Sequence, residues 1–314
     1  MTRPRPSSSP FGPLRLVVNP RAGRGSAGRT LPALRAALDA RGVLHEVVET
    51  DGPRGAGPAA RAALEDGVRF VAAVGGDGTV HEVVNGLLTV EGEPRAPGLV
   101  FGVASGGSGC DFARTFGLDR KPEVVARHLA SEATMEIDLG VVTFTDLGGR
   151  PAQRLFANIA QVGWGADVVR RADRLPRWLG RVRYLVAAYA AIGGLDRQET
   201  EVSVAHTSTT VPVVDLVVAN CQFFGGGMKV APRALPDDGK FNVQVFTGER
   251  SQVFTMTQKI YRGEHLPHPN VVEWQSPTVE IAPPRPLAVE ADGELLGRTP
   301  ATFRLVERAL RLKI

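Results

Sequence analysis

The chain has 314 residues, of which 43% are hydrophobic and 22% charged, and its formal net charge is +4. This length suits two domains that each bury a core, and the composition is that of a globular protein. The only cysteines, Cys110 and Cys221, are too few for a disulfide framework or a thiolate metal site. No apolar run approaches the roughly 18 residues of a membrane-spanning helix. The sequence therefore predicts a cytoplasmic protein with a disordered tail over residues 1–13.

The positive charge suits an anionic partner, and one arginine-rich stretch indicates which kind. It contains Arg170, Arg171, Arg174, Arg177, Arg181 and Arg183, with Trp178 among them. An apolar helix over 184–192 follows, and this combination is typical of a surface that docks on an anionic bilayer. The alternative is a solvated arginine face on an ordinary packed helix. Aromatic residues make up only 6% of the chain, which argues against nucleic-acid binding.

Residues 14–137 alternate between strand-like and helix-like segments. Apolar strands are expected at 14–19, 45–50, 69–74 and 99–104, and helices at about 26–40, 59–65, 79–88, 111–116 and 123–130. This alternation predicts an α/β fold, a doubly wound, Rossmann-like parallel sheet with helices on both faces. Ligands of such a domain bind at the carboxyl ends of the strands.

Residues 138–314 contain many short β-like runs and one helical insertion near 166–193. They predict an antiparallel β-sandwich domain, whose last residues pack back on the first domain. An open sheet edge in this domain would permit a homodimer.

The segment GGDGTVHE, at 75–82, follows an apolar strand and precedes an amphipathic helix. Gly75, Gly76 and Gly78 allow backbone N–H groups to point at an anion beside the positive end of the helix. Asp77 repels a phosphate, so its role would be to orient water or a metal, to accept a proton, or to bond a hydroxyl group. The alternative is a simple strand-to-helix turn that Asp77 caps.

Two further glycine loops also follow predicted strands. GRGSAG, at 23–28, matches the dinucleotide pattern GxGxxG, with Glu46 and Glu49 about 20 residues later, but such a match is common in a glycine-rich chain. GGSG, at 106–109, follows the fourth strand. If the three loops meet in one crevice, they form a site rich in N–H groups that face phosphate.

The second domain contributes two acidic turns. Asp237 and Asp238 lie near Lys229, a combination that suits Mg²⁺ and phosphate, although DDG is also a common solvated turn. Asp292 and Glu294 are two residues apart, which on an extended chain places both side chains on one face. One would be a general base and the other its orienter or a metal partner, whereas DGE alone is a hairpin-turn signal.

Together, these motifs resemble the diacylglycerol kinase-type lipid kinase family, which includes bacterial lipid kinases and sphingosine and ceramide kinases. The resemblance runs from Leu14 to Ile314 and rests on VVNPRAGRG, AVGGDGTVHEVVNGL, GSGCDFARTFG, NIAQVGWGADV, FFGGGMKVAPRALPDDG and EADGE. It implies an ATP- and Mg²⁺-dependent kinase that phosphorylates a lipid hydroxyl at the membrane surface. It also implies that the domain over residues 138–314 binds lipid and metal.

The resemblance also implies roles for single residues. ATP would be bound by Asn19, Pro20, Arg21, Ala22, Gly23, Thr50, Gly75, Gly76, Asp77, Gly78, Thr79, Val80, His81, Glu82 and Ser108. Mg²⁺ would be bound by the Asp238 carboxylate and the carbonyls of Leu235 and Lys240. The catalytic carboxylates would be Glu294, at the position of the proton acceptor in bacterial members, Asp77, which matches the sphingosine kinase assignment, and Asp292, which would orient the base or a metal. Asp111 would bond the lipid headgroup.

The chain departs from the family in its third glycine loop. The usual PxGTxND becomes SGGSGCD, in which Ser108 keeps a hydroxyl group and Cys110 replaces an amide. His81 stands where bacterial members have asparagine. These departures leave the acceptor lipid open. The alternatives are an NAD kinase, which shares GGDGT, and a nucleotide-binding pseudokinase at the membrane.

Overall fold

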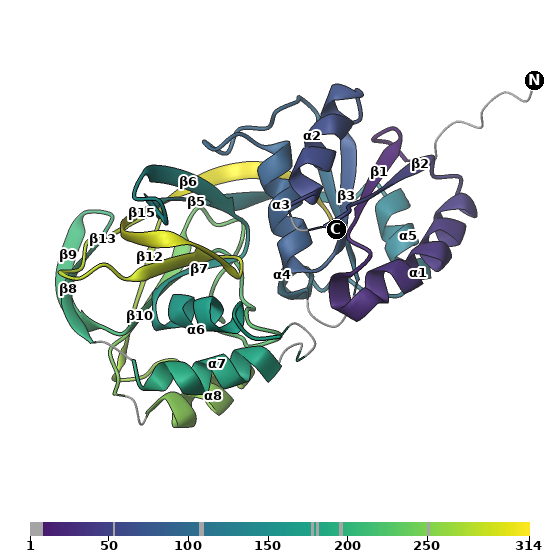
Figure 1. The fold of residues 1–314 in the computed structure, drawn as a ribbon. Coiled ribbons are helices and arrows are strands. Elements are labelled where there is room, and N and C mark those ends of the chain that lie inside the picture. Colours follow the sequence, from purple (N-terminus) through teal and green to yellow (C-terminus); the bar gives the residue numbers. More distant parts are fainter. Residues whose placement is uncertain are drawn as a thin grey trace, which may run out of the picture. The chain divides into compact units, whose positions relative to one another are not determined.

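The computed structural model describes residues 9–52, 54–106, 110–176, 179, 182–194, 197–249 and 252–314. It divides into two compact units (Figure 1). Unit 1 comprises Met1–Ile137 together with Arg308–Ile314, and unit 2 comprises Asp138–Glu307. No helix in the described part of the chain is long and apolar enough to cross a bilayer.

Unit 1 is built on a parallel sheet in the order β2-β1-β3-β4. The strands are β1 (Leu14–Val18), β2 (His45–Glu49), β3 (Phe70–Gly75) and β4 (Val100–Ser105). The helices are α1 (Ala22–Asp39), α2 (Ala56–Glu65), α3 (Asp77–Leu87), α4 (Asp111–Thr115) and α5 (Pro122–Ala130). Helices α1 and α5 pack together on one face of the sheet, and α2 and α3 on the other (Figure 1). The doubly wound fold predicted from the alternating pattern is confirmed.

The apolar character of the central strands explains why helices cover both faces of this sheet. Every residue of β1 and β3 is buried, and β4 is buried except at its last residue, Ser105. Their side chains pack against buried leucines of α1 and against Val125 and Leu129 of α5. A half-exposed strand alternates between apolar and polar residues, whereas a strand that is buried on both faces is mostly apolar throughout. The sequence shows the second pattern in this sheet.

The expected disordered tail is wrong for residues 9–13. Phe11 packs on the core, and its ring lies edge-to-face with that of Phe70, with 5.8 Å between ring centroids. Ser9 is buried, and its carbonyl accepts a hydrogen bond from the Gly12 N–H. Burial of an aromatic ring outweighs the polar composition of this stretch. The rest of the expected tail, residues 1–8, lies outside the described residues.

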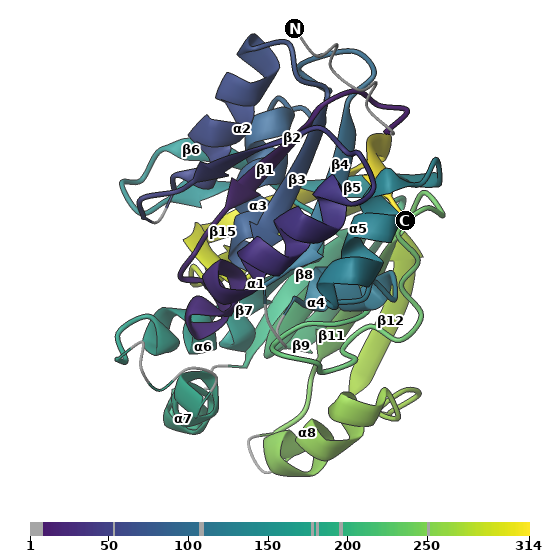
Figure 2. The same ribbon diagram turned by 90° about the vertical axis from the view of Figure 1, so that its right-hand side faces the viewer.

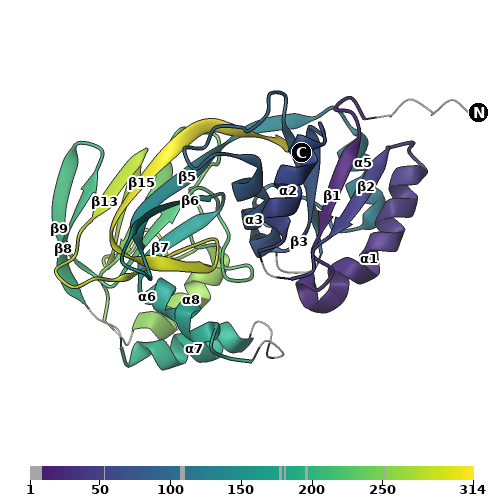
Figure 3. The ribbon, with the colours of Figure 1, turned by 45° about the horizontal axis from the view of Figure 1, so that its top comes forward.

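Unit 2 contains antiparallel strands, which confirms the predicted β-rich second domain. They are β6 (Pro151–Phe156), β7 (Ile159–Gly163), β8 (Gln198–Val204), β9 (Thr207–Val213), β10 (Asp215–Ala219), β11 (Phe241–Phe246), β12 (Val271–Ser276), β13 (Thr278–Ile281) and β14 (Ala288–Ala291). Two long strands, β5 (Thr134–Asp146) and β15 (Glu294–Lys313), extend past its bounds. The order runs β12-β11-β10-β7-β14-β15. Strand β13 pairs with β15 and with β8, and β8 pairs with β9 (Figure 3).

The core of unit 2 is aromatic and aliphatic. The rings of Phe156 and Phe241 stack with 5.6 Å between centroids, and Phe303 meets Phe156 edge-on at 6.3 Å. The unit also contains three helices, α6 (Trp164–Ala172), α7 (Val182–Ile192) and α8 (Gln252–Arg262). Helices α6 and α7 lie beside each other, whereas α8 is farther along the unit (Figure 2). The single insertion predicted near 166–193 is thus two helices.

One glycine sets how closely the two helices on one face of unit 1 approach. A Cβ atom on Gly86 of α3 would lie 2.4 Å from the Gly57 carbonyl oxygen and 3.0 Å from the Ala60 Cβ, both on α2. We expect Gly86→Ala to reduce the free energy of unfolding by on the order of 2 kcal/mol, even after the roughly 1 kcal/mol that alanine gains inside a helix.

Urea denaturation measures this effect. Gly52→Ala is the control, because a Cβ there has no heavy atom within 4 Å. Unfolding curves of the two variants that overlay would contradict the close approach of α2 and α3.

Candidate active site

The loops after the four strands of unit 1 are tied together at the carboxyl edge of the sheet. The Asn19 N–H donates to the Val74 carbonyl at 3.0 Å, and the Thr50 N–H donates to Val18 at 2.8 Å. The Gly106 N–H donates to the Gly75 carbonyl at 2.7 Å. The described residues that are predicted to bind ATP therefore follow strands that end at the same edge of the sheet. Ser108, predicted to contact phosphate, lies outside the described residues.

The start of α3 has the geometry of an anion seat. Gly76 is extended and precedes the helix, and its carbonyl accepts hydrogen bonds from the N–H groups of Thr79 and Val80. These two bonds close the first turn of α3, and the N–H groups that precede Thr79 lie at the positive end of the helix dipole, where an anion is stabilised. A Cβ on Gly75 would lie 2.3 Å from the Thr79 Oγ1, so the turn requires glycine there.

The glycine loop after β1 forms a left-handed turn at the start of α1. Gly23, Arg24 and Gly25 have φ angles of 59°, 59° and 79°, so the regular helix starts near Ser26, as the sequence predicts. The Arg21 N–H donates to the Asn19 Oδ1 at 3.2 Å and fixes the loop. Gly28, the last glycine of the GxGxxG match, packs closely, because a Cβ there would lie 3.1 Å from the Pro20 carbonyl oxygen.

Some of the residues predicted to bind ATP turn their side chains inward. Thr79, Val80 and His81 are buried, so a contact of their side chains with ATP is not supported by the structure. The Glu82 carboxylate accepts hydrogen bonds from the N–H groups of Arg54, at 2.9 Å, and Ala56, at 2.8 Å. Glu82 thereby holds the start of α2 beside α3, a structural role that the sequence did not indicate.

Asp77 is oriented by α4, which directly follows the glycine loop where this chain departs from the family pattern. Its Oδ1 accepts a hydrogen bond from the Phe112 N–H, at the start of α4, at 3.0 Å. Burial raises the pKa of the Cys110 thiol well above its ordinary value, and the charge of Asp77 raises it further. Cys110 is therefore a protonated, packed thiol beside Asp77. Asp111, expected to bond a lipid headgroup, is buried, and its Oδ1 lies 3.6 Å from the Arg114 Nε.

The expectation that Asp292 and Glu294 share a face of one strand is wrong. Asp292 and Gly293 have φ angles of 51° and 86°, so they form the two-residue turn between β14 and β15. The Asp292 carboxylate accepts hydrogen bonds from the backbone N–H groups of Ala157, Asn158 and Ile159, at 2.9 to 3.2 Å. Asp292 thus connects this turn to the start of β7, and the half-buried Glu294 begins β15 directly after it.

Two buried acids near this hairpin were not predicted. Glu290 is fully buried on β14, and its Oε2 accepts a hydrogen bond from the Gly293 N–H at 2.8 Å. Asp215, at the start of β10, accepts the Gly165 N–H of α6 at 3.0 Å. Burial raises the pKa of Glu290 well above its ordinary value and that of Asp215 to about 8. Single acids inside apolar strands give no sequence signal that separates a neutral buried acid from a catalytic one.

The DDG turn presents hard oxygen ligands. The Asp238 Oδ1 accepts the Lys240 N–H at 3.1 Å, and Asp138, which the sequence did not single out, accepts the Gly239 N–H at 2.8 Å. Partial burial raises the pKa of Asp238, and the charges of Asp138 and Asp237 add to the rise. A cation would relieve this repulsion. No cluster of three or more His, Cys, Asp or Glu side chains suited to a metal occurs in the described part of the chain. Carboxylate oxygens are the ligands that Mg²⁺ prefers, and Mg²⁺ binding at this turn stays a prediction.

Matches to family models and similarity to known proteins identify the same family. Residues 13–142 match the model of the diacylglycerol kinase catalytic domain, and residues 158–314 match that of the YegS C-terminal NAD kinase beta sandwich-like domain. A diacylglycerol kinase of Mycobacterium tuberculosis is 30% identical over 310 residues, which cover 96% of this chain and 95% of that protein. An Escherichia coli protein named "Probable lipid kinase YegS" is 27% identical and covers 79% of each chain.

The fold is also shared with a solved structure. The crystal structure of a diacylglycerol kinase from Bacillus anthracis superposes with a TM-score of 0.70. The match covers 97% of each chain at 19% sequence identity.

The three hydrogen bonds that the Asp292 carboxylate accepts from backbone N–H groups give a stability prediction. Asp292→Ala leaves buried N–H groups without an acceptor, so we expect the free energy of unfolding to fall by on the order of 3 kcal/mol. Asp292→Asn keeps one acceptor oxygen and should lose less. Urea denaturation at neutral pH measures both variants. Equal stability of the alanine variant and the native protein would contradict this role for Asp292.

The raised pKa of Asp215 gives a pH prediction. The folded chain binds this proton more tightly than the unfolded chain, whose carboxyl has an ordinary pKa near 3.8. The stability contributed by the neutral acid is complete below that value and is lost as the pH rises towards about 8. Asp215→Asn keeps an acceptor for the Gly165 N–H without titrating.

We therefore expect the melting temperature of Asp215→Asn, relative to the native protein, to rise between pH 5 and pH 9. A difference that is constant over this range would show that Asp215 is ionised in the folded chain. Thermal unfolding followed by circular dichroism in matched buffers makes the comparison.

Proposed function

The chain belongs to the diacylglycerol kinase catalytic-domain family and is a lipid kinase, and we propose that it transfers the γ-phosphoryl group of ATP to a hydroxyl group of diacylglycerol or a related lipid alcohol, such as a sphingoid base. The observation that carries the ATP part of the proposal is the joining of the strand-end loops in unit 1 through the hydrogen bonds of Asn19, Thr50 and Gly106. The start of α3 opens beside these loops.

ATP would be held mainly by backbone groups. Phosphoryl transfer needs positioning and neutralisation of charge more than covalent chemistry by the protein. The N–H groups at the start of α3 offer hydrogen bonds to phosphate oxygens, and the left-handed turn from Gly23 to Gly25 brings Arg21 and Arg24 to the same loop region. Both features favour a triphosphate over a neutral ligand.

Two carboxylates remain candidates for the group that accepts the proton of the lipid hydroxyl. Glu294 is half-buried and follows a turn that is fixed through Asp292 and through the bond from Gly293 to Glu290. Asp77 is fixed by the Phe112 N–H. A fixed carboxylate is a more effective base than a mobile one, because its orientation is settled before the reaction. We rank Glu294 first and keep Asp77. Asp292 would position Glu294 rather than take the proton.

Magnesium enters the proposal in two places. At the DDG turn, the Asp238 carboxylate and the carbonyl oxygens of Leu235 and Lys240 would hold a structural ion. When bound with ATP, Mg²⁺ neutralises charge on the phosphate oxygens. The residues of this chain position the nucleotide and the acceptor hydroxyl.

We also propose peripheral contact with the membrane, because the acceptor is a lipid. Val186 and Tyr189 of α7 are exposed, at 44% and 53%, and α7 packs beside α6, which contributes Arg170 and Arg171. Apolar side chains beside arginines suit the surface of an anionic bilayer. Three residues of this stretch, Arg177, Trp178 and Arg181, lie outside the described residues. A cytoplasmic location and a homodimer stay predictions.

Transfer of labelled γ-phosphate from Mg·ATP to lipids in mixed micelles tests the proposal. The acceptors are diacylglycerol, sphingosine and ceramide, with NAD as a soluble acceptor, since NAD kinases share the GGDGT motif. Glu294→Gln should reduce turnover at least about 100-fold if Glu294 is the base, and Asp77→Asn should do so if Asp77 is. Asn85→Ala serves as the control, because Asn85 lies on α3 like Asp77, donates a hydrogen bond to the His81 carbonyl, and is assigned no role in binding or chemistry.

The outcomes separate the possibilities. A labelled lipid that is lost in one of the two variants identifies the acceptor class and the base. Near-native turnover of both variants, with unchanged melting temperatures, would refute both assignments. Labelled NADP would identify an NAD kinase, and ATP binding without a labelled product would identify a pseudokinase.

A further inference from the structure

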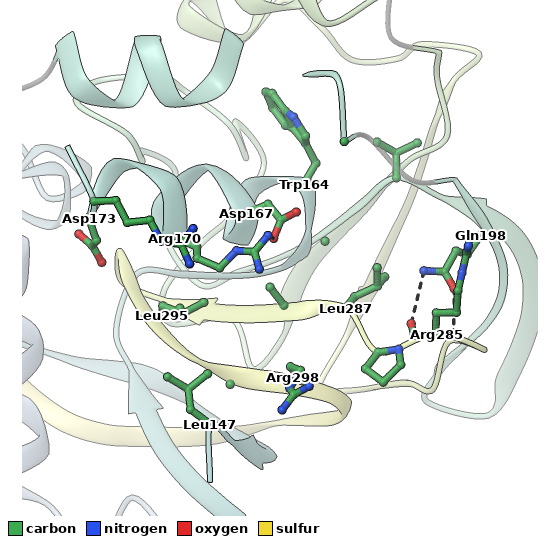
Figure 4. A pocket seen from close by; sticks show the side chains of 17 residues that line it. Leu147, Trp164, Asp167, Arg170, Asp173, Gln198, Arg285, Leu287, Leu295 and Arg298 are labelled. Atoms are coloured by element: carbon green, nitrogen blue, oxygen red, sulfur yellow. Dashed lines mark hydrogen bonds and ion pairs between the residues drawn. The ribbon is translucent and has the colours of Figure 1, made fainter. Parts of the chain in front are cut away.

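A cavity of about 650 Å³ lies within unit 2, between helix α6 and the β14–β15 hairpin. Figure 4 shows Asp167 and Arg170 on α6 near the β14–β15 hairpin, with Leu295 on β15 and Arg298 further along it. Leu287 directly precedes β14. Cavities of roughly 300–1,000 Å³ are typical of sites for small organic ligands. This one is larger than a single phosphate group requires.

The wall of the cavity is positively charged. Four arginines line it, Arg170, Arg174, Arg285 and Arg298, against two aspartates, Asp167 and Asp173, which leaves a net charge of +2. Asp167 already neutralises Arg170, because its Oδ1 lies 2.8 Å from the Arg170 Nη2. Arg298 is exposed and forms an ion pair with no carboxylate in the described part of the chain. The arrangement therefore leaves the Arg298 guanidinium available for an anion.

The remaining wall is apolar. Leu147, Trp164, Leu287 and Leu295 line the same cavity. A free inorganic anion gains nothing from contact with leucine and tryptophan side chains, whereas a ligand with a charged group and a hydrocarbon portion buries apolar area against them. The guanidinium groups offer paired N–H donors that match the geometry of a phosphate. The wall thus offers donors for a phosphate group and apolar surface for hydrocarbon, and a phospholipid has both of these parts.

We propose that this arginine-lined cavity binds the phosphate group of an anionic phospholipid, with the start of its acyl chains against the leucines. The ligand is distinct from ATP, and the inference does not depend on phosphoryl transfer. It concerns unit 2 alone. A phosphodiester with one negative charge matches the excess positive charge, whereas the cationic amine of a zwitterionic lipid opposes it.

Isothermal titration with short-chain lipids below their micelle concentration tests the proposal directly. The ligands are dihexanoylphosphatidylglycerol, dihexanoylphosphatidylcholine and inorganic phosphate. The native protein should bind the anionic lipid at least about tenfold more tightly than either of the others, because charge-assisted hydrogen bonds and apolar burial act together. Equal affinity for inorganic phosphate would overturn the lipid assignment, and equal affinity for the zwitterionic lipid would overturn the role of charge.

Matched variants locate the site. Arg298→Ala should weaken binding of the anionic lipid about tenfold, and Arg298→Lys, which keeps the charge but loses the planar fork, should weaken it less. Arg304→Ala is the control, because Arg304 is also exposed on β15, is not part of the cavity wall, and changes the net charge equally. If the Arg298 and Arg304 variants lose affinity equally, or if neither changes it, the cavity is not the site.

A second readout uses the membrane itself. Co-sedimentation with vesicles of phosphatidylcholine, with and without phosphatidylglycerol, should show binding that requires the anionic lipid and that Arg298→Ala reduces more than Arg304→Ala does. The protein has a net charge of +4 and would attract anionic vesicles in any case. The difference between two variants of equal charge removes that general attraction, and the absence of any difference would contradict the proposal.

Discussion

The close meeting of three loops at the end of β3 is the constraint on which the nucleotide side of the structure depends. A Cβ on Gly106 would lie 2.5 Å from the Ala27 Cβ and 3.2 Å from the Gly75 Cα. Gly75 itself has no room for a Cβ beside Thr79. The loops after β3 and β4 and the start of α1 therefore contact one another through backbone and small residues. Larger side chains there would push the loops apart and separate the N–H groups that the proposed site uses together.

The same constraint explains what the sequence predicted well in unit 1. Continuous apolar strands, helix periodicity and glycine turns are local signals, and the parallel sheet follows from their alternation. The carboxyl ends of parallel strands share one edge, so Asn19, Thr50, Gly76 and Gly106 had to approach one another. The role of Glu82 was beyond prediction, because its hydrogen bonds to Arg54 and Ala56 cross 28 and 26 residues of sequence.

Unit 2 shows where sequence reasoning stops. The DGE motif is compatible with an extended strand or with a hairpin turn, and only the positive φ angles of Asp292 and Gly293 distinguish the two. The partners of Asp292, near Asn158, lie more than 130 residues away along the chain. Glu290 and Asp215 sit in apolar strands like any other single polar residue. Their burial depends on which strands pair, and a short motif does not contain that information.

The buried acids and the arginine-lined cavity are electrostatically connected. Asp167 lines the cavity, and its charge, after burial, is one of the causes that raise the pKa of Asp215 to about 8. At neutral pH Asp215 is therefore uncharged, and the pKa of the buried Glu290 is likewise raised well above its ordinary value. Two ionised carboxylates behind the wall would cancel the net charge of +2. Because Asp215 is uncharged, it does not oppose the field of the arginines in the wall. It follows that the attraction of the cavity for an anion weakens as the pH rises through about 8, because Asp215 ionises over this range.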